Sequence, residues 1–120
     1  MTTILIVEDE VFVRQSAEWT IEDIGYDTLA AEDPDQAMAF LSAPGQIDAL
    51  FVDIRLSARG LAGYDVAKQA LTLRPNLLVL YTSGSPLTAD MTDQFVVGGQ
   101  FLQKPYSPSQ LGVSLGHLFH

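Results

Sequence analysis

The sequence predicts an α/β domain in which one parallel β-sheet is covered by α-helices on both faces. Short apolar runs, which are typical of buried strands, alternate with longer segments whose apolar residues recur at helical spacing. The strand–helix unit repeats at intervals of roughly 20–25 residues, which favours parallel strands joined by right-handed crossovers. No linker, low-complexity tract or internal repeat interrupts the 120 residues, so we expect a single domain with its own core.

The first strand and helix are predicted from an apolar run and an amphipathic segment. Residues 4–7 are apolar without interruption, as in a strand buried on both faces of a parallel sheet, and they lead into Glu8 and Asp9. Residues 11–24 carry apolar side chains at helical spacing with polar residues between them. Gly25 follows as the expected C-terminal stop of this helix.

The second strand is predicted over residues 26–31 and has a weaker pattern than the first. The helix after it has a clear start. Asp33 is expected to cap it, because Pro34 favours the first helical position and Gln36 completes a capping box. The dipeptide Pro44-Gly45 ends the helix.

The central strand is predicted over residues 49–53, where apolar residues run directly into Asp53. Ligands of parallel α/β sheets bind just outside the carboxyl ends of the strands, so a carboxylate at this point is well placed for chemistry. Taken alone, Asp53 is equally compatible with a turn or a helix cap. A loop containing glycines follows, and a helix is predicted over residues 64–73.

The fourth strand is predicted over residues 77–81 and runs into Thr82 and Ser83. The next helix is expected over residues 88–97, where two consecutive glycines end it. Its low apolar content predicts weak anchoring to the core, so that the helix is able to shift.

A short fifth strand at residues 101–102 is followed closely by Lys104. Ser107 and Gln110 form a capping-box pattern that starts the last helix. Three leucines give this helix one apolar face: Leu111, Leu115 and Leu118. The helix is therefore expected to pack on the sheet.

The composition excludes several classes of function. The chain has 6 basic and 15 acidic residues, a formal net charge of −9, which argues against direct nucleic-acid binding because Lys and Arg bind phosphate backbones. The same charge suits a metal cation or a basic partner surface. The absence of cysteine excludes disulfides, thiolate zinc sites and a cysteine nucleophile. No apolar run reaches the ~18 residues of a membrane span and no signal pattern opens the chain, so we expect a cytoplasmic protein without membrane contact.

Polar side chains of particular kinds follow four of the five predicted strands. Glu8 and Asp9 follow the first strand, Asp53 ends the third, Thr82 follows the fourth and Lys104 the fifth. Since parallel strands bring these ends to one edge of the sheet, we expect the side chains to lie together. Three carboxylates repel one another unless a cation joins them, and oxygen ligands select a hard ion such as Mg²⁺. With a hydroxyl and an ammonium group, such a site is equipped to hold a phosphoryl group in line with a carboxylate nucleophile.

Four motifs at these strand ends resemble those of the receiver domain of two-component response regulators. The motifs are Val7-Glu8-Asp9-Glu10, Val52-Asp53, Thr82-Ser83-Gly84 and Lys104-Pro105-Tyr106. The resemblance extends from Ile4 to about Leu118, and together the motifs are specific to that family. It implies a doubly wound (βα)5 flavodoxin-like domain over residues 1–120, with strand order 2-1-3-4-5 and no output domain.

The resemblance implies a phosphoryl acceptor beside a magnesium site. Asp53 would take a phosphoryl group from a phosphohistidine and form an acyl phosphate. Asp9 would bind Mg²⁺ directly at a site shared with Asp53, and Glu8 would lie nearby and act through water. The backbone carbonyl of Arg55 would be a further ligand of the ion.

The resemblance also implies a switch. Lys104 would pair with the phosphoryl oxygens, and a cis bond before Pro105 would aim it inward. Thr82 would move to hydrogen-bond the phosphoryl group, which would draw in residues 83–87 and reshape the face made by the fourth helix, fifth strand and fifth helix. Phe101 occupies the position of an aromatic residue that turns inward in the active state, and plain core packing is the alternative.

The loop after Asp53 departs from the common family pattern. Ser57 stands where the family has a proline, and the glycine expected eight residues after the acceptor is Gly63, ten residues after it. We therefore expect a loop about two residues longer than usual. Arg55 is the second departure: its guanidinium would shield an acyl phosphate, contact a partner or point into solvent, and the sequence leaves these alternatives open.

The expected function is that of a phosphoacceptor in two-component phosphorelay signalling, not that of an enzyme acting on external substrates. The expected partners are a sensor histidine kinase or a histidine phosphotransfer protein, and a downstream protein. The domain would be a monomer or a phosphorylation-dependent dimer. One alternative is a degenerate receiver that only binds partner proteins. Another is a Mg²⁺-dependent aspartyl phosphatase, but Arg55 occupies the place where such enzymes carry a general acid.

Overall fold

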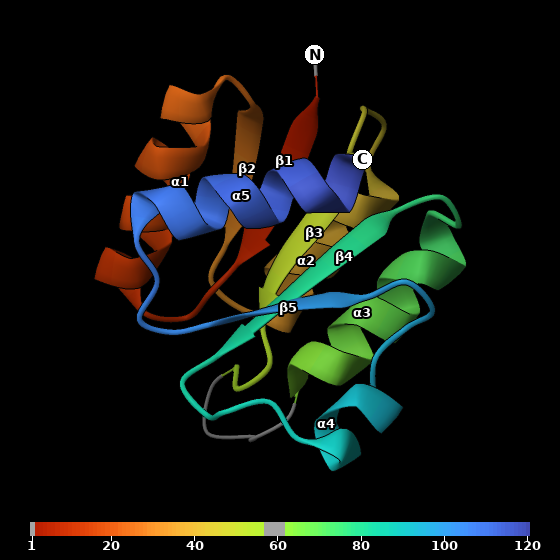
Figure 1. Cartoon of the computed structure of the whole chain (residues 1–120). Helices are drawn as coiled ribbons and strands as arrows, with labels where there is room; N and C mark the ends of the chain where they lie inside the picture. The colour runs from red at the N-terminus through yellow and green to blue at the C-terminus, as the bar shows by residue number, and fades with distance from the viewer. Residues whose placement is uncertain (1, 57–61) are drawn as a thin grey trace.

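The computed structural model describes residues 2–56 and 62–120. The strands are β1 (Thr3–Val7), β2 (Asp27–Ala31), β3 (Ala49–Asp53), β4 (Leu78–Ser83) and β5 (Gln100–Gln103). The helices are α1 (Val11–Ile24), α2 (Pro34–Ser42), α3 (Ala62–Leu73), α4 (Ala89–Asp93) and α5 (Pro108–Phe119). All strand pairs are parallel and the order is β2-β1-β3-β4-β5 (Figure 1), which confirms the predicted fold class and topology.

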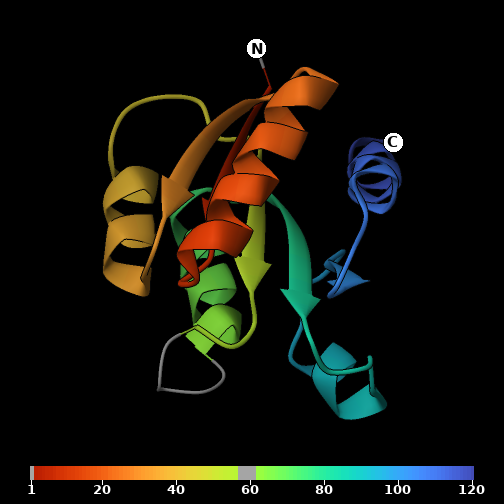
Figure 2. The ribbon, with the colours of Figure 1, turned by 90° about the vertical axis from the view of Figure 1, so that its left-hand side faces the viewer.

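Helices α1 and α5 cover one face of the sheet, and α2 and α3 cover the other (Figures 1 and 2). Side chains alternate along each strand, so one strand feeds both cores: Leu5 of β1 packs in the α2–α3 core, and Ile6 packs in the α1–α5 core. Every residue of β3 is buried, as expected for the central strand. None of the described helices is long and apolar enough to span a membrane.

The sequence signals at the ends of α1, α2 and α5 act as predicted, with one difference. Gly25 ends α1 in the left-handed conformation, with φ of 113°. The Asp33 side chain caps α2 by accepting a hydrogen bond from the Gln36 amide at 2.8 Å. The Gln36 side chain accepts from the Glu32 amide instead of closing a capping box on the N-cap residue. The box over residues 107–110 at α5 is complete.

Helix α4 is much shorter than the predicted 88–97 and covers only five residues. After it, the amides of Gln94 and Phe95 donate hydrogen bonds to the carbonyl oxygens three residues earlier, at 3.0 and 3.1 Å. The Val96 amide then donates to the Tyr81 hydroxyl at 3.0 Å instead of to a helical carbonyl. A tertiary hydrogen bond therefore replaces the helical one, which corrects the prediction made from local spacing.

Helix α3 begins two residues earlier than predicted and includes Gly63, which the sequence analysis assigns to the loop. The Gly63 amide donates to the carbonyl of Ile54 at 2.9 Å. A β-carbon on Gly63 would lie 2.2 Å from the carbonyl oxygen of Asp53, so only glycine lets α3 start directly against the end of β3. Ser57 and the added loop length lie outside the described residues.

Candidate functional site

The carboxyl ends of four parallel strands meet at one edge of the sheet. Glu8 and Asp9 follow β1, and Asp53 is the last residue of β3. Thr82 lies opposite Asp53 in the register of β3 and β4. Lys104 directly follows β5, and its amide donates to the last carbonyl of β4 at 2.8 Å. The five positions singled out from the strand ends are therefore neighbours.

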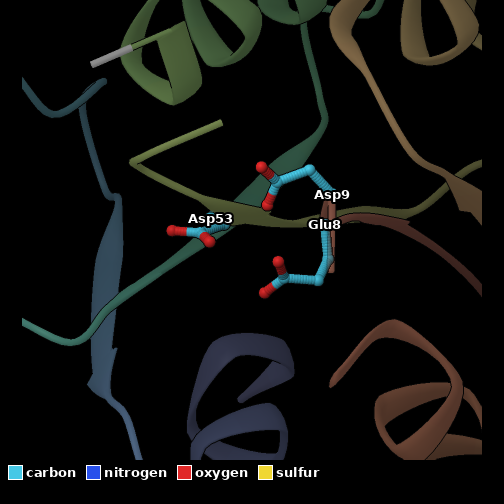
Figure 3. Close-up of side chains that lie close together, drawn as sticks. All are labelled: Glu8, Asp9 and Asp53. Atoms are coloured by element: carbon cyan, nitrogen blue, oxygen red, sulfur yellow. The ribbon is translucent and has the colours of Figure 1, made fainter. Parts of the chain in front are cut away.

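Glu8, Asp9 and Asp53 form a carboxylate cluster in which the side chains turn toward a common space (Figure 3). Each offers an oxygen, and these oxygens all lie within 4.8 Å of one another. Glu8 and Asp53 are buried, with 4% and 6% of their surface exposed, whereas Asp9 is exposed. The cluster is therefore reached from solvent on its Asp9 side.

Lys104 binds the two buried members of the cluster. Its Nζ lies 2.5 Å from Oε1 of Glu8 and 2.9 Å from Oδ2 of Asp53. Among the described residues, the two buried carboxylates share the single Lys104 ammonium group, and uncompensated charge is costly in a buried setting. Carboxylate oxygens are the ligands that hard divalent cations prefer, so the donor set fits Mg²⁺.

The pKa values of Glu8 and Lys104 reflect this environment. Burial raises the pKa of Glu8 to about 7, against the lowering effect of its hydrogen bonds with Lys104 and the Glu10 amide. Burial would lower the pKa of Lys104, but its hydrogen bonds to Glu8 and Asp53 outweigh this and raise the pKa above its ordinary value. Lys104 therefore stays cationic at neutral pH, while Glu8 gains or loses a proton near pH 7.

Backbone groups fix the orientation of the two buried carboxylates. The Glu10 amide donates to Oε2 of Glu8, and the Arg55 amide donates to Oδ1 of Asp53, both at 3.0 Å. The Arg14 guanidinium donates to the carbonyl oxygen of Glu8 at 2.9 Å, which holds the turn from β1 into α1. Each of the two carboxylates thus has one oxygen on an amide and the other facing Lys104.

The Thr82 hydroxyl is buried and has no hydrogen-bond partner among the described residues. The residue is 3% exposed, and it pairs with Asp53 on the neighbouring strand. Leaving a buried hydroxyl without a partner costs about 1–3 kcal/mol, so such groups need an explanation. The Thr82 hydroxyl is placed to donate a hydrogen bond to an oxygen of a group bound next to the Asp53 carboxylate.

Two other predicted residues lie outside the cluster. The Arg55 side chain is exposed and lines an open cavity of about 490 Å³ together with Asp65 and Asp90, an arrangement that agrees with the solvent-facing alternative. The role of its backbone carbonyl stays a prediction. Phe101 lies half buried on β5, and its ring stacks on Phe95 with centroids 6.3 Å apart, which is the core-packing arrangement.

Tyr106 borders the site, and the sequence alone assigns it no role. Its ring packs edge-on against Phe51 at 5.8 Å. Burial raises the pKa of the Tyr106 phenol to about 12, partly offset by the Lys104 charge. Its place in the Lys104-Pro105-Tyr106 motif is the one signal that points to it. The Lys104–Pro105 peptide bond within this motif is cis, as predicted.

Comparison with known sequences finds relatives along most of the chain. The family profile of the response regulator receiver domain matches residues 4–115. The alginate biosynthesis transcriptional regulatory protein AlgB of Pseudomonas aeruginosa is 31% identical over 109 residues, which are 90% of this chain and 24% of that protein. The uncharacterized transcriptional regulatory protein YrkP of Bacillus subtilis is 27% identical over 109 residues, 90% of this chain and 45% of that protein. The chain thus spans less than half the length of these relatives.

Solved structures of similar fold cover nearly the whole chain. The response regulator receiver protein of Sinorhizobium medicae has a TM-score of 0.86 at 28% identity, covering 98% of this chain and 93% of that one. The chemotaxis protein CheY4 of Vibrio cholerae also has a TM-score of 0.86, at 22% identity and covering 98% of both chains. At this lower identity the likeness supports the fold alone.

Proposed function

The chain belongs to the response regulator receiver domain family, and we propose that Asp53 is its phosphoryl acceptor. The setting of the Asp53 carboxylate carries this proposal. The carboxylate is buried at the end of β3 and lies 2.9 Å from Lys104 Nζ. Asp53 is paired with Thr82, whose hydroxyl has no partner in the described part of the chain. An anionic nucleophile, a fixed cation and an unused donor thus converge on the space where a transferred group would lie.

In the proposed reaction a carboxylate oxygen of Asp53 attacks the phosphorus of a phosphohistidine on a partner protein. The new P–O bond forms as the P–N bond breaks, and the imidazole nitrogen keeps the electron pair. The product is an acyl phosphate on Asp53. Attack of water on the phosphorus later releases inorganic phosphate and restores the carboxylate. The protein would then act as a signalling phosphoprotein, not as an enzyme on external substrates.

Lys104 and Thr82 are proposed to bind the phosphoryl oxygens. The Lys104 ammonium already lies against Asp53, so charge on a transferred group would be neutralised with little rearrangement. The Thr82 hydroxyl would donate to a phosphoryl oxygen and gain a hydrogen bond that the described residues do not provide. This exchange of partners is the proposed start of the switch, with Phe101 repacking as a later step.

Glu8, Asp9 and Asp53 are proposed to hold one Mg²⁺ ion, with the Arg55 carbonyl as a further ligand. The ion would neutralise the carboxylates and the oxygens of the transferred group. The donor set supports this assignment, since each of the three carboxylates offers an oxygen within 4.8 Å of the others, and the two buried carboxylates share the Lys104 ammonium group.

The proposed partners are proteins. Membership of the receiver family implies a histidine kinase or a histidine phosphotransfer protein as the phosphoryl donor. A downstream protein would read the face made by α4, β5 and α5, either on a monomer or on a phosphorylation-dependent dimer. A net charge of −9 and the lack of an excess of Lys and Arg favour this cytoplasmic, protein-based role over direct contact with nucleic acid.

Mass spectrometry of the intact protein tests the proposal. After incubation with acetyl phosphate and Mg²⁺, we expect a mass gain of one phosphoryl group in the parent protein and none in Asp53→Asn. Asp65→Asn is the matched control, because Asp65 is an exposed acid on α3 near the same sheet edge. It should gain the group as the parent does.

Absence of the mass gain in the parent would contradict the acceptor role and favour the degenerate receiver that only binds partners. A mass gain that persists in Asp53→Asn would show that another residue is the phosphoryl acceptor. Release of phosphate from a generic phosphate ester with repeated turnover would instead favour the aspartyl phosphatase.

A further inference from the structure

Tyr81 lies immediately before Thr82 on β4 and is fully buried. Successive side chains of a strand point to opposite faces of the sheet. Tyr81 accordingly packs in the core on the α2–α3 face, where partly buried residues of α4 and the segment after it also pack. Its phenol therefore reaches from the strand that carries Thr82 to a segment remote from the carboxylate cluster.

Three contacts join Tyr81 to residues 95–99, which we call the α4–β5 connection. The Tyr81 hydroxyl accepts a hydrogen bond from the Val96 amide at 3.0 Å. The ring stacks on Phe95 with centroids 4.2 Å apart and an interplanar angle of 17°. A β-carbon on Gly99 would lie 2.8 Å from Cε2 of Tyr81, so the backbone at this residue closely approaches the ring. Residue 99 is thus kept small by Tyr81.

The rest of this region is weakly anchored. No residue of α4 is buried, and Val97 is fully exposed. Phe95 supplies further packing, with its ring 6.2 Å from Tyr64 and 6.3 Å from Phe101. Figure 1 shows α4 outside the layers that cover the sheet, beside one end of α3, and Lys68 of α3 donates to Gln94, the residue after α4, at 3.4 Å. Tyr81 is accordingly the side chain through which β4 holds the α4–β5 connection.

We propose that Tyr81 is a latch that keeps the α4–β5 connection in its resting arrangement. The inference rests on the proposed function, because it requires Thr82 to move toward a phosphoryl group on Asp53. Tyr81 and Thr82 are consecutive in β4, so a displacement that brings the Thr82 hydroxyl to a phosphoryl oxygen also shifts the Tyr81 phenol relative to Val96. Breaking that hydrogen bond releases the connection and, with it, α4.

The latch has a thermodynamic consequence. A contact that stabilises only the resting state lowers the affinity for a ligand that selects the activated state. Removing the contact therefore raises that affinity. A tyrosine that only fills the core has no such effect, since its removal weakens both states equally.

Tyr81→Phe tests the latch, because it removes the hydroxyl and keeps the ring. Tyr64→Phe is the matched control: Tyr64 is also buried in the same aromatic group, 5.9 Å from Tyr81, and the described residues provide no hydrogen-bond partner for its hydroxyl. In amide hydrogen exchange without any phosphoryl donor, we expect the Val96 amide to exchange about fivefold faster in Tyr81→Phe. Tyr64→Phe should match the parent.

A second measurement titrates the same variants with beryllofluoride and Mg²⁺ as a mimic of the phosphoryl group. Tyr81→Phe should bind the mimic about three- to fivefold more tightly than the parent, and Tyr64→Phe equally well. The mimic should also accelerate Val96 exchange in the parent, and have little further effect in Tyr81→Phe.

Unchanged Val96 exchange in Tyr81→Phe would overturn the latch, and so would faster exchange with unchanged affinity for the mimic. Failure of the parent to bind beryllofluoride would count against the proposed function instead. The exchange measurement is made without the mimic, so it would still decide whether Tyr81 holds the connection.

Discussion

The carboxylate cluster lies at the carboxyl ends of the strands, whereas the α4–β5 connection leads into the amino end of β5, and the two regions are built in opposite ways. Every residue of β3 is buried, whereas no residue of α4 is. The two buried carboxylates of the cluster are each held by a backbone amide and by Lys104. The connection depends largely on one hydrogen bond and one stacked ring from Tyr81.

This contrast is what the proposed function requires, since it combines phosphoryl chemistry with a structural response in one small domain. A reacting carboxylate needs neighbours that do not move, because small errors in position weaken catalysis. A signalling segment needs an alternative arrangement that costs little, which favours short helices with few buried residues. Strand β4 belongs to both regions, with Thr82 facing the cluster and Tyr81 facing the connection.

The largest expected effect on stability comes from substituting Gly63, where α3 begins against the end of β3. Gly63→Ala places a β-carbon 2.2 Å from the Asp53 carbonyl oxygen, so α3 or the end of β3 must shift. We expect a loss of about 3 kcal/mol or more in the free energy of unfolding, measured by urea denaturation. Gly116→Ala in α5 is the control: open space surrounds that position, and alanine should stabilise the helix by about 0.5–1 kcal/mol. Equal effects of the two substitutions would refute the close approach of α3 to β3.

The next effect concerns the proton on Glu8. The folded-state pKa of about 7 lies above the ordinary 4.5, so the folded protein binds the proton more tightly than the unfolded chain. The stabilisation is complete below about pH 4.5 and is lost as the pH rises through about 7. In metal-free buffer, Glu8→Gln should therefore be more stable than the parent by about 2 kcal/mol at pH 8, with a smaller difference at pH 5.

Urea denaturation in EDTA at several pH values measures this difference. Adding Mg²⁺ at pH 8 should stabilise the parent more than Glu8→Gln, because bound cation favours the ionised carboxyl. Parallel stability curves for the two proteins between pH 5 and pH 8 would show that burial of Glu8 does not raise its pKa.

The smallest effect compares the N-cap of α4, a helix with no buried residue, with the N-cap of α5, a helix that packs on the sheet. Thr88 caps α4 by accepting from the Met91 amide at 3.3 Å, and Ser107 caps α5 with a complete capping box. Ser107→Ala should lower the free energy of unfolding by about 1 kcal/mol. Thr88→Ala should lower it by less than about 0.5 kcal/mol, because a five-residue helix with no buried residue is expected to open locally before the domain unfolds. A cost at Thr88 as large as at Ser107 would mean that α4 is an integral part of the cooperative core.

The strands and the ends of most helices could be predicted from the sequence, because the patterns that specify them are local. Uninterrupted apolar runs predict buried parallel strands, and parallel strands place Glu8, Asp53, Thr82 and Lys104 at one edge. The predicted topology is therefore enough to bring most of the site residues together. The ends of α1 and α5 follow from Gly25 and the capping box over residues 107–110, which act within a single turn.

The differences arise where distant parts of the chain meet. The spacing of Met91 and Phe95 suggests a longer helix, but the Val96 amide bonds to a tyrosine from another strand. The start of α3 depends on how closely Gly63 approaches the backbone of β3, which no local pattern encodes. That the Thr82 hydroxyl finds no partner among residues 2–56 and 62–120 is likewise a property of the packed structure, not of the motif that contains it.

Chemical trapping of the acyl phosphate would identify the phosphoryl acceptor itself. Borohydride reduces an aspartyl phosphate to homoserine, and peptide mass spectrometry then locates the altered residue. After treatment with acetyl phosphate and Mg²⁺, the proposed acceptor role of Asp53 predicts homoserine at position 53 and at no other acid, with the signal lost when EDTA is added first. Homoserine at another aspartate, or none at all under conditions where the protein is folded, would contradict it.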